Sequence, residues 1–315
     1  MELDKIYNEE CIYGMKRIPD GSVDAVVCDL PYGTMKGINE KFEWDECIPT
    51  QPLFDSYERV LRRGGVAVLF SQEPYTSHLR SFKLHNMLFC YPLIWKKNSP
   101  GNSMMAQKAP VSFFEDISVF VKYADSALIY PLRDYAKRVM EYTGMSGARM
   151  EKILAKNGVE KPYEIHHFIC GDGSSQIRMI NETAYNSIIE HFHIDKMDGF
   201  KTYDELKQID AQYKQQYGRV FNLPDGKKSM SNILEFQKDN GTFHPTQKPV
   251  SLIQTIVEIY TNPGDLVLDN CMGSGTTAVA CIRSNRHYVG FELNKEYFDK
   301  ATARIEMENS MLRLF

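Results

Sequence analysis

The stretch of this sequence that most constrains its fold is VLDNCMGSGTTAVA, residues 267–280. An apolar segment ending in Asp269 is followed by Gly273-Ser274-Gly275 and then by a segment typical of a helix. Glycines at such a turn let the backbone approach a ligand closely, and the free N–H groups of a helix N-terminus attract anionic groups. The next apolar segment ends in Glu292, where a carboxylate suits the hydroxyls of a ribose. Together these features predict a site for a nucleoside cofactor.

The same loop argues against two other nucleotide sites. It lacks the Gly-Lys-Ser/Thr ending of a phosphate-binding P-loop. A nicotinamide fingerprint would need a glycine at Ala278, where the helix has already begun. An ordinary tight turn between a strand and a helix, with no ligand, is the alternative interpretation.

Strand-like and helix-like segments alternate at both ends of the chain. Short, mostly apolar strands are predicted at 22–29, 64–71, 88–95, 116–121, 265–269 and 287–292. Helices are predicted at 51–63, 246–261, 276–285 and from Asn294 onward. Continuous apolar strands that alternate with helices predict an α/β fold, with a doubly wound, mostly parallel sheet covered on both faces.

The middle of the chain, 124–240, is polar, helix-rich and nearly neutral, and is interpreted as an inserted helical domain. Residues 1–123 and 241–315 then form one domain. Within the insert, 135–158 predicts two helices around Gly144, with Ser146 as a helix N-cap. The pair is either a helix-turn-helix that directs Arg149, Lys152 and Lys156 toward DNA or an ordinary helical hairpin.

Composition favours an intracellular protein with a local rather than a global basic surface. The formal charge is −4 and the pI is about 6.1, so nucleic-acid binding would need a basic patch. Seven cysteines without a CxxC pair favour a reduced cytoplasm. Neither a signal peptide nor a membrane span of roughly 18 apolar residues is apparent. The histidine pairs at 166–167 and 191–193 lack zinc spacing, and we expect no metal.

The tetrapeptide DLPY, residues 29–32, follows the first buried strand and suits one specific reaction. An amine on a flat aromatic base is a poor nucleophile because its lone pair is delocalised into the ring. Asp29 and the carbonyl of Leu30, fixed by Pro31, can accept its hydrogens and restore a pyramidal nitrogen. Tyr32 offers a ring on which the base can stack, worth about 1–3 kcal/mol per base.

DLPY together with DNCMGSGTT resembles the beta class of DNA amino-methyltransferases, which use S-adenosylmethionine and occur in phages and restriction-modification systems. The tetrapeptide precedes the insert and the glycine loop follows it, which is the permuted order of that class. The resemblance covers 1–123 and 241–309. It implies a Rossmann-like methyltransferase sheet and a target-recognition domain in place of the insert.

The resemblance also implies the site residues. Asp29, Leu30, Pro31 and Tyr32 would be catalytic. Glu10 and Cys11 would approach the adenine of the cofactor, Lys248 its methionine carboxylate, and Glu292 its ribose. The implied cofactor-binding set is Glu10, Cys11, Asp29, Lys248, Asp269, Cys271, Gly273, Ser274, Gly275, Thr276, Thr277 and Glu292.

The sequence departs from the family pattern at two positions. Leu30 replaces the first proline of a double proline, but its carbonyl remains available. Met272 replaces an aromatic residue before the first glycine, and a flexible thioether can fill the same apolar space. An aspartate rather than a serine at position 29 favours adenine over cytosine as the target base.

Residues 59–108 hold eight basic side chains against Glu73 alone, which predicts a surface for DNA phosphates. The expected DNA contacts are Arg62, Arg63, Lys96, Lys97, Lys108, Arg149 and Lys152. A solvated basic face is the alternative. The loop 33–47 is expected to close over a flipped base. Trp44 either takes part in that closure or packs in the core and anchors the helix that follows.

The resulting hypothesis is a site-specific methyltransferase that acts on the N6 amine of a flipped-out adenine in double-stranded DNA. N4-cytosine methylation, methylation of RNA or a small nucleoside, and a catalytically dead DNA-binding regulator are the alternatives. A homodimer is expected from the family resemblance.

Overall fold

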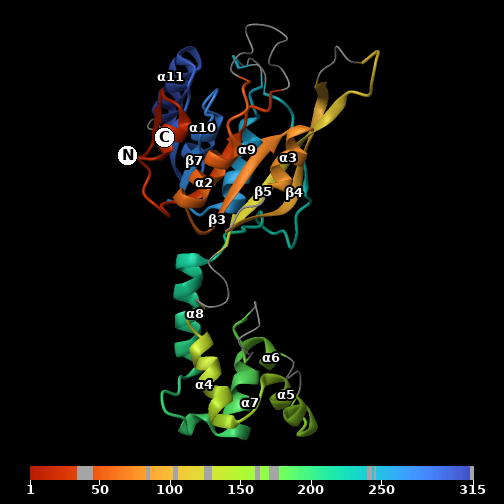
Figure 1. The fold of residues 1–315 in the computed structure, drawn as a ribbon, viewed down its shortest axis with the longest axis vertical. Helices are drawn as coiled ribbons and strands as arrows, with labels where there is room; N and C mark the ends of the chain where they lie inside the picture. Colours follow the sequence, from red (N-terminus) through yellow and green to blue (C-terminus); the bar gives the residue numbers. More distant parts are fainter. Residues whose placement is uncertain are drawn as a thin grey trace. The chain divides into compact units, whose positions relative to one another are not determined.

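The computed structural model describes residues 1–33, 45–82, 86–101, 106–123, 130–159, 164–169, 177–239, 243–244 and 246–312. Two compact units divide the chain: Met1–Tyr123 with Arg219–Phe315, and Ala124–Gly218 (Figure 1). Trp44 and most of the loop predicted to close over a base lie outside the described residues.

An eight-stranded sheet forms the centre of the first unit, in the order β1-β8-β7-β2-β3-β5-β4-β6. The strands are β1 Lys5–Tyr7, β2 Val23–Asp29, β3 Leu61–Ser71, β4 Met87–Gly101, β5 Ser112–Lys122, β6 Ile233–Glu235, β7 Leu266–Asp269 and β8 His287–Phe291. Only β5 runs antiparallel to its neighbours β3 and β4; the other adjacent strands are parallel. The predicted α/β fold with a mostly parallel sheet is confirmed.

Helices cover both faces of this sheet, because alternate residues of each strand point to opposite sides. Ala25 and Val27 of β2 join the core with α9 Val250–Tyr260, α10 Thr276–Arg283 and α11 Lys295–Leu312. Val26 and Cys28 join the core with α1 Cys11–Met15, α2 Thr50–Val60 and α3 Tyr75–Ser81. A doubly wound arrangement therefore buries β2 on both faces.

The direction of winding reverses between β7 and β2. From β7 the chain passes through α10 to β8, and from β2 it passes through α2 to β3 on the other side. Ala25 pairs with Val267 and Val26 with Leu268, so Asp29 and Asp269 end adjacent parallel strands. Ligands of open α/β sheets bind at such a switch point, beyond the carboxyl ends of the strands.

Some boundaries differ from those expected. The helix predicted over 51–63 ends at Val60, because Leu61 is extended and already pairs with Val23 in the sheet. The two adjacent glycines at 64–65 therefore lie inside β3. The strands β1 and β6 were not predicted, because three residues are too few to show a period.

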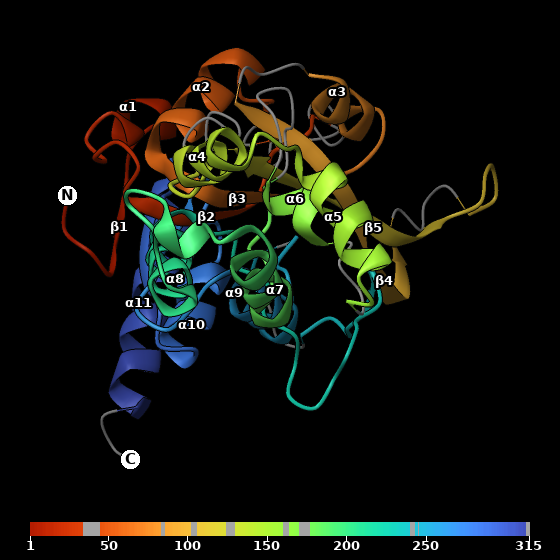
Figure 2. The same cartoon turned by 90° about the horizontal axis from the view of Figure 1, so that it is seen from below.

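The second unit is helical in the part that the structure describes (Figure 2). Its helices are α4 Arg133–Thr143, α5 Gly147–Lys156, α6 Ile165–Phe168, α7 Glu182–Phe192, η4 Ile194–Lys196 and α8 Tyr203–Tyr217. Gly144, with a φ of 65°, ends α4, and Ser146 occupies the N-cap position of α5 without a side-chain hydrogen bond. These helices surround their own hydrophobic core, which includes Tyr135, Leu154 and Tyr185.

The expected end of the insert at 240 is too late. The compact unit ends at Gly218, since the chain beyond it returns to the sheet. The N–H of Asn222 donates to the carbonyl of Ile259 over 2.8 Å, and β6 pairs with β4. None of the described helices is long and apolar enough to cross a membrane.

Candidate active site

A cavity of about 1170 Å³ opens at the carboxyl ends of β2 and β7. It brings together the two sequence motifs, DLPY at 29–32 and the loop that begins at Asp269, although residues 33–268 separate them in the chain. The predicted residues in its wall are Glu10, Cys11, Asp29, Leu30, Pro31, Tyr32, Lys248, Asp269, Cys271, Gly273, Ser274, Thr276, Thr277 and Glu292. Small-molecule sites usually enclose about 300–1,000 Å³, so this cavity has room for a nucleoside cofactor and a base together.

Asp269 holds the glycine loop in place. Its Oδ1 accepts the N–H of Cys271 over 3.0 Å, and its Oδ2 accepts the hydroxyl of Thr277 over 2.6 Å. Burial raises the pKa of Asp269 to about 6, although the Thr277 hydrogen bond opposes the rise. The carboxylate therefore links the end of β7 to the first turn of α10.

The two loop glycines have different reasons to be glycine. Both have positive φ, 52° at Gly273 and 77° at Gly275. Gly273 lies in the cavity wall, where a Cβ would meet the His244 ring at 3.6 Å. Gly275 is not part of the wall; a Cβ there would lie 3.3 Å from Ala301 of α11. Gly275 therefore serves the packing of the loop, whereas Gly273 faces the site.

Backbone N–H groups orient the two glutamates at the rim. Glu292 accepts the N–H of Gly273 over 2.7 Å and that of Asn294 over 2.8 Å. Glu10 caps α1 by accepting the N–H groups of the two residues that follow Cys11. A carboxylate offers about four lone-pair sites, so Glu292 can still accept a ligand hydroxyl beside these backbone contacts.

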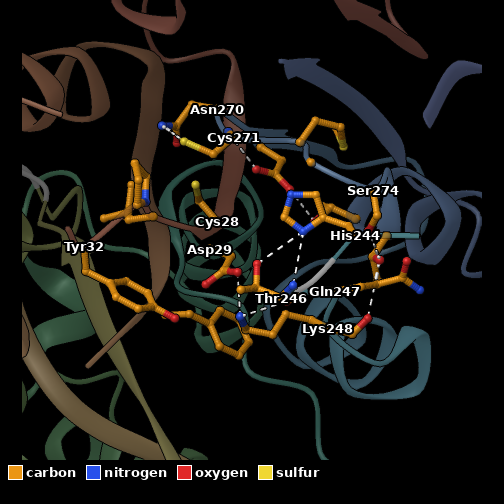
Figure 3. Close-up of a pocket in the computed structure, with 18 of the residues that line it drawn as sticks. Cys28, Asp29, Tyr32, His244, Thr246, Gln247, Lys248, Asn270, Cys271 and Ser274 are labelled. Carbon is orange, nitrogen blue, oxygen red and sulfur yellow. Dashed lines mark hydrogen bonds and ion pairs between the residues drawn. The ribbon is translucent and has the colours of Figure 1, made fainter. Parts of the chain in front are cut away.

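Asp29 is the last residue of β2, and only one of its two carboxylate oxygens has a hydrogen-bond partner among the described residues. Its Oδ2 lies 2.5 Å from the Nζ of Lys248 (Figure 3). Its Oδ1 is buried and has no hydrogen-bond partner among the described residues. Burial raises the pKa of Asp29 to about 6; Lys248 opposes the rise and Glu115 adds to it. An open acceptor in a cavity wall suits a ligand N–H.

The turn that follows Asp29 is fixed by Asp45. Its Oδ1 accepts the N–H groups of Tyr32 and Gly33 over 2.9 and 3.0 Å. Asp45 is itself buried, and Tyr32 is half-buried with its side chain in the cavity wall. The ring of Tyr32 is therefore presented to the cavity by a backbone that its own hydrogen bonds hold.

Lys97 and Glu115 lie in the same wall. Lys97 Nζ is 3.1 Å from Glu115 Oε1, and Glu115 Oε2 is 3.2 Å from Lys248 Nζ. The prediction that Lys97 contacts DNA phosphates is wrong, because only 1% of its side chain is exposed. Glu115 was not predicted, although an acid inside the apolar segment 113–121 was a signal for it.

Arg62 and Arg63 lie at the opposite end of β3 from the cavity. Arg62 Nε pairs with Asp24 Oδ1 at 2.6 Å, and Asp24 Oδ2 accepts the N–H of Leu266 over 2.8 Å. Arg62 thus joins the amino ends of neighbouring strands rather than reaching toward the site. Four other predicted DNA contacts are exposed: Lys96, Lys108, Arg149 and Lys152.

His244 is a wall residue that sequence reasoning did not single out. Its ring packs on Tyr297 with centroids 4.4 Å apart and is 8% exposed. Burial, with the charge of Lys248, lowers the pKa of His244 to about 4, so the ring is neutral near pH 7. Its place in the HPTQKP segment beside Lys248 was the available signal.

Met272 fills the apolar space expected for it. Its side chain is buried against the central strands, and its methyl group lies where a Cβ on Gly290 would be. Across the described residues, no three His, Cys, Asp or Glu side chains are grouped to hold a metal ion.

Comparison with known proteins gives consistent matches. A family model described as DNA methylase matches residues 23–303. Type II methyltransferase M.HindIII of Haemophilus influenzae is 23% identical, over 98% of this chain and 97% of that protein. DNA adenine methyltransferase YhdJ of Escherichia coli is 25% identical, over 97% of this chain and 84% of that protein.

Two solved structures share the fold. The M1.HpyAVI–SAM complex has a TM-score of 0.53 and 21% identity, over 95% of this chain and 98% of that one. The cytosine-N4-specific PvuII DNA methyltransferase has a TM-score of 0.51 and 13% identity, over 95% of this chain and 85% of that one.

Proposed function

Because this chain belongs to the DNA methylase family whose model matches residues 23–303, we propose that it methylates the N6 amine of adenine at specific sites in DNA. S-adenosylmethionine is the proposed methyl donor. Two similar proteins are named for related activities, a type II methyltransferase and a DNA adenine methyltransferase. A structural neighbour of the same fold is named as a complex with SAM.

The observation that carries the proposal is the open oxygen of Asp29 in a cavity that also contains the glycine loop. Asp29 Oδ1 is buried without a partner among the residues described, whereas Oδ2 is engaged by Lys248. Leaving a buried acceptor unpaired costs about 1–3 kcal/mol, and a ligand N–H would recover that cost. The exocyclic amine of a nucleobase is such a donor.

Each residue of the tetrapeptide 29–32 has a separate proposed role toward the target base. Asp29 and the Leu30 carbonyl are proposed to accept the two amine hydrogens, which turns the nitrogen lone pair out of the ring plane. Pro31 restricts the turn. Tyr32, held through its N–H by Asp45, offers its ring for stacking. A base inside a duplex cannot reach this cavity, so we propose that it flips out of the helix.

The walls of the cavity fit S-adenosylmethionine. Glu292 keeps free lone pairs for ribose hydroxyls, and Gly273 lets the backbone come close to a ligand. Glu10 and Cys11 lie on the same wall for the adenine. The expected contact of Lys248 with the methionine carboxylate stays a prediction, because its ammonium group already faces Asp29, Glu115 and the Thr246 carbonyl.

When bound, the cofactor supplies a methyl group on a positively charged sulfur, and the C–S electron pair leaves with the sulfur as the N–C bond forms. The amine nitrogen would give up one proton, which the carboxylate of Asp29 would accept and release to solvent. Asp29 Oδ1 is placed to hold that N–H as its charge develops. Holding two reactants in line supplies roughly 7–11 kcal/mol toward the barrier, which is the main contribution proposed for this site.

Exposed basic side chains are the proposed contacts to the DNA backbone. Lys96 and Lys108 belong to the first unit, and Arg149 and Lys152 lie along α5 in the second. Each phosphate contact of this kind adds to affinity and to its salt dependence without reading sequence. We propose that the second unit recognises the target sequence, and that the protein acts in the cytoplasm, with a homodimer as its expected assembly.

N4-cytosine methylation is the second candidate reaction. A cytosine-N4-specific enzyme shares the fold at 13% identity, so the fold itself does not choose between the bases. The aspartate at position 29 and the name of the adenine-specific relative favour adenine. A catalytically dead regulator is a weaker candidate, because the sequence contains the polar residues that the proposed reaction needs. The core motifs do not exclude methylation of RNA or of a small nucleoside, but the large insert and the basic stretch favour a polymer as substrate.

The function is tested with purified protein, labelled S-adenosylmethionine and unmethylated DNA, followed by nucleoside mass spectrometry. We expect N6-methyladenine. N4-methylcytosine alone would contradict the choice of base, and no transfer to DNA, with or without transfer to RNA, would contradict the function. Asp29→Asn should still bind the cofactor in calorimetry, through the remaining residues of the binding set, and lose about 100- to 10,000-fold in turnover. Full turnover by that variant would remove Asp29 from the reaction.

A further inference from the structure

Three buried charged side chains and the partly exposed Asp29 form a continuous chain of ion pairs along one wall of the cavity. Lys97 pairs with Glu115 at 3.1 Å, Glu115 with Lys248 at 3.2 Å, and Lys248 with Asp29 at 2.5 Å. They come from β4, β5, the segment before α9, and β2. The exposed fractions of the side chains are 1% for Lys97, 9% for Glu115, 5% for Lys248 and 24% for Asp29.

Stability alone does not account for such a chain. Desolvation costs several kcal/mol per buried ion, and apolar side chains of similar volume are often as stable or more so. All four residues line the cavity. The end of the chain nearest the proposed reaction is Asp29, so a role in setting the state of that carboxylate is the natural interpretation.

Glu115 limits how Lys248 can approach Asp29. The Lys248 ammonium faces Asp29 Oδ2, Glu115 Oε2 and the carbonyl of Thr246, which lies 3.4 Å away. Asp29 Oδ2 and the Thr246 carbonyl accept hydrogen bonds from this ammonium, and Glu115 Oε2 attracts it as an ion-pair partner without a hydrogen bond. Glu115 is in turn fixed through its other oxygen by Lys97. Without Glu115, the ammonium would be free to turn toward both oxygens of Asp29.

We propose that Glu115, anchored by Lys97, is a positioning residue that draws Lys248 to one side and so keeps Asp29 Oδ1 open for the target amine. This inference rests on the proposed function, because it assigns Glu115 and Lys97 a part in the same reaction. Neither side chain touches the proposed reacting atoms in this role. They act through Lys248.

The charges of the chain predict opposite effects for its two outer members. Besides Lys248 and Glu115, the groups that face Asp29 are Asp45, Tyr32, Asp269 and the thiols of Cys28 and Cys271. Lys238 and His244 face Lys248 and its partners. Since Glu115 is a like charge, removing it favours ionised Asp29. Removing Lys97 leaves Glu115 less compensated and disfavours ionised Asp29.

The test compares wild type with Glu115→Gln, Lys97→Met and the double variant. Asp116→Asn is the matched control, because Asp116 is the next residue of β5 and pairs with Arg80 at 2.9 Å, outside the cavity wall. Single-turnover methyl transfer to DNA is measured across the acid pH range, with KM for DNA and calorimetric cofactor affinity. Urea unfolding of the ligand-free proteins over the same pH range gives a readout independent of activity.

We expect Glu115→Gln to lose about 10- to 100-fold in turnover, with KM and cofactor affinity nearly unchanged. Its acid limb should move to lower pH, by on the order of one unit, and that of Lys97→Met to higher pH. In the double variant the acid limb of the pH–rate profile should lie close to that of the wild type. The pH dependence of urea unfolding should shift in the same direction as the acid limb for each variant. Asp116→Asn should lower stability without moving either limb.

Three results would overturn the inference. If the wild type is active and the pH profiles of all variants coincide with its own, the proposed function stands but Glu115 and Lys97 have no positioning role. Glu115→Gln and Lys97→Met shifting in the same direction would show general loss of folding rather than charge positioning. A wild-type protein that transfers no methyl group to DNA would overturn the proposed function and this inference with it.

Discussion

Replacing Lys248 with Met should destabilise the first unit strongly near neutral pH and less in acid. The substitution removes the ammonium that lies 2.5 Å from Asp29 and 3.2 Å from Glu115. Breaking a buried ion pair by removing one partner costs about 3–5 kcal/mol. We expect the lower end, about 3 kcal/mol, because Lys97 still compensates Glu115 and the Asp29 side chain is partly exposed.

The pH dependence of that loss follows from the two carboxylates left behind. Without Lys248, burial and mutual repulsion raise the pKa of both above their values in the unfolded chain. The folded state then binds protons more readily than the unfolded state, so stability increases as pH falls toward the unfolded pKa values. The deficit against wild type should therefore be largest near about pH 8 and shrink toward about pH 5.

Equilibrium urea unfolding followed by tryptophan fluorescence measures this directly, because Trp44 and Trp95 both belong to the sequence of the first unit. Lys300→Met is the matched control: it breaks an exposed pair with Glu296, and such i,i+4 pairs contribute at most about 0.5 kcal/mol. Equal losses for the two variants, or a Lys248→Met deficit that is the same at both pH values, would refute the reasoning.

Three further predictions follow from individual contacts. Thr277→Val removes the hydroxyl that donates to Asp269 and should lower the free energy of unfolding in urea by about 1.5–3 kcal/mol. An unchanged urea midpoint would show that this hydrogen bond does not stabilise the fold. Gly147→Ala would place a Cβ 2.4 Å from the carbonyl oxygen of Ile169 and should therefore lower the unfolding temperature of the second unit in calorimetry. The unfolding transition of the first unit, followed by tryptophan fluorescence, should not move, and equal shifts of both transitions would contradict this. Methyl transfer should decline below about pH 6 as Asp29, whose pKa burial raises, takes up a proton; a flat rate down to about pH 5 would argue against an ionised Asp29 in the reaction.

The pairing of the two motifs at one cavity was predictable because each is written in consecutive residues. An apolar strand followed by DLPY, and another followed by a glycine loop, both place their functional residues at strand ends. Carboxyl ends of parallel strands share one edge of a sheet, so local patterns were enough to predict which residues meet. The structure confirms the sheet and shows both motifs in one cavity wall.

The second unit shows where local patterns stop short. Its helices and the turn at Gly144 follow from periodicity and a glycine, but the boundary at Gly218 does not. The segment after Gly218 is polar and looks like the insert, yet Asn222 hydrogen-bonds to Ile259 of α9 and a three-residue strand, β6, joins the sheet. Pairing with a distant strand, rather than composition, assigns it to the first unit.

By itself, the sequence determined the six longer strands, the glycine turn and the order of the motifs, because these depend on neighbours along the chain. Only the tertiary structure decided the state of the charges. Lys97 looked like a surface cation and is buried against Glu115, Arg62 is taken up by Asp24, and Lys248 reaches Asp29 across 219 positions. The sequence around a lysine does not show whether its ammonium group will contact water or a carboxylate, because the partner comes from a distant part of the chain that only folding brings close.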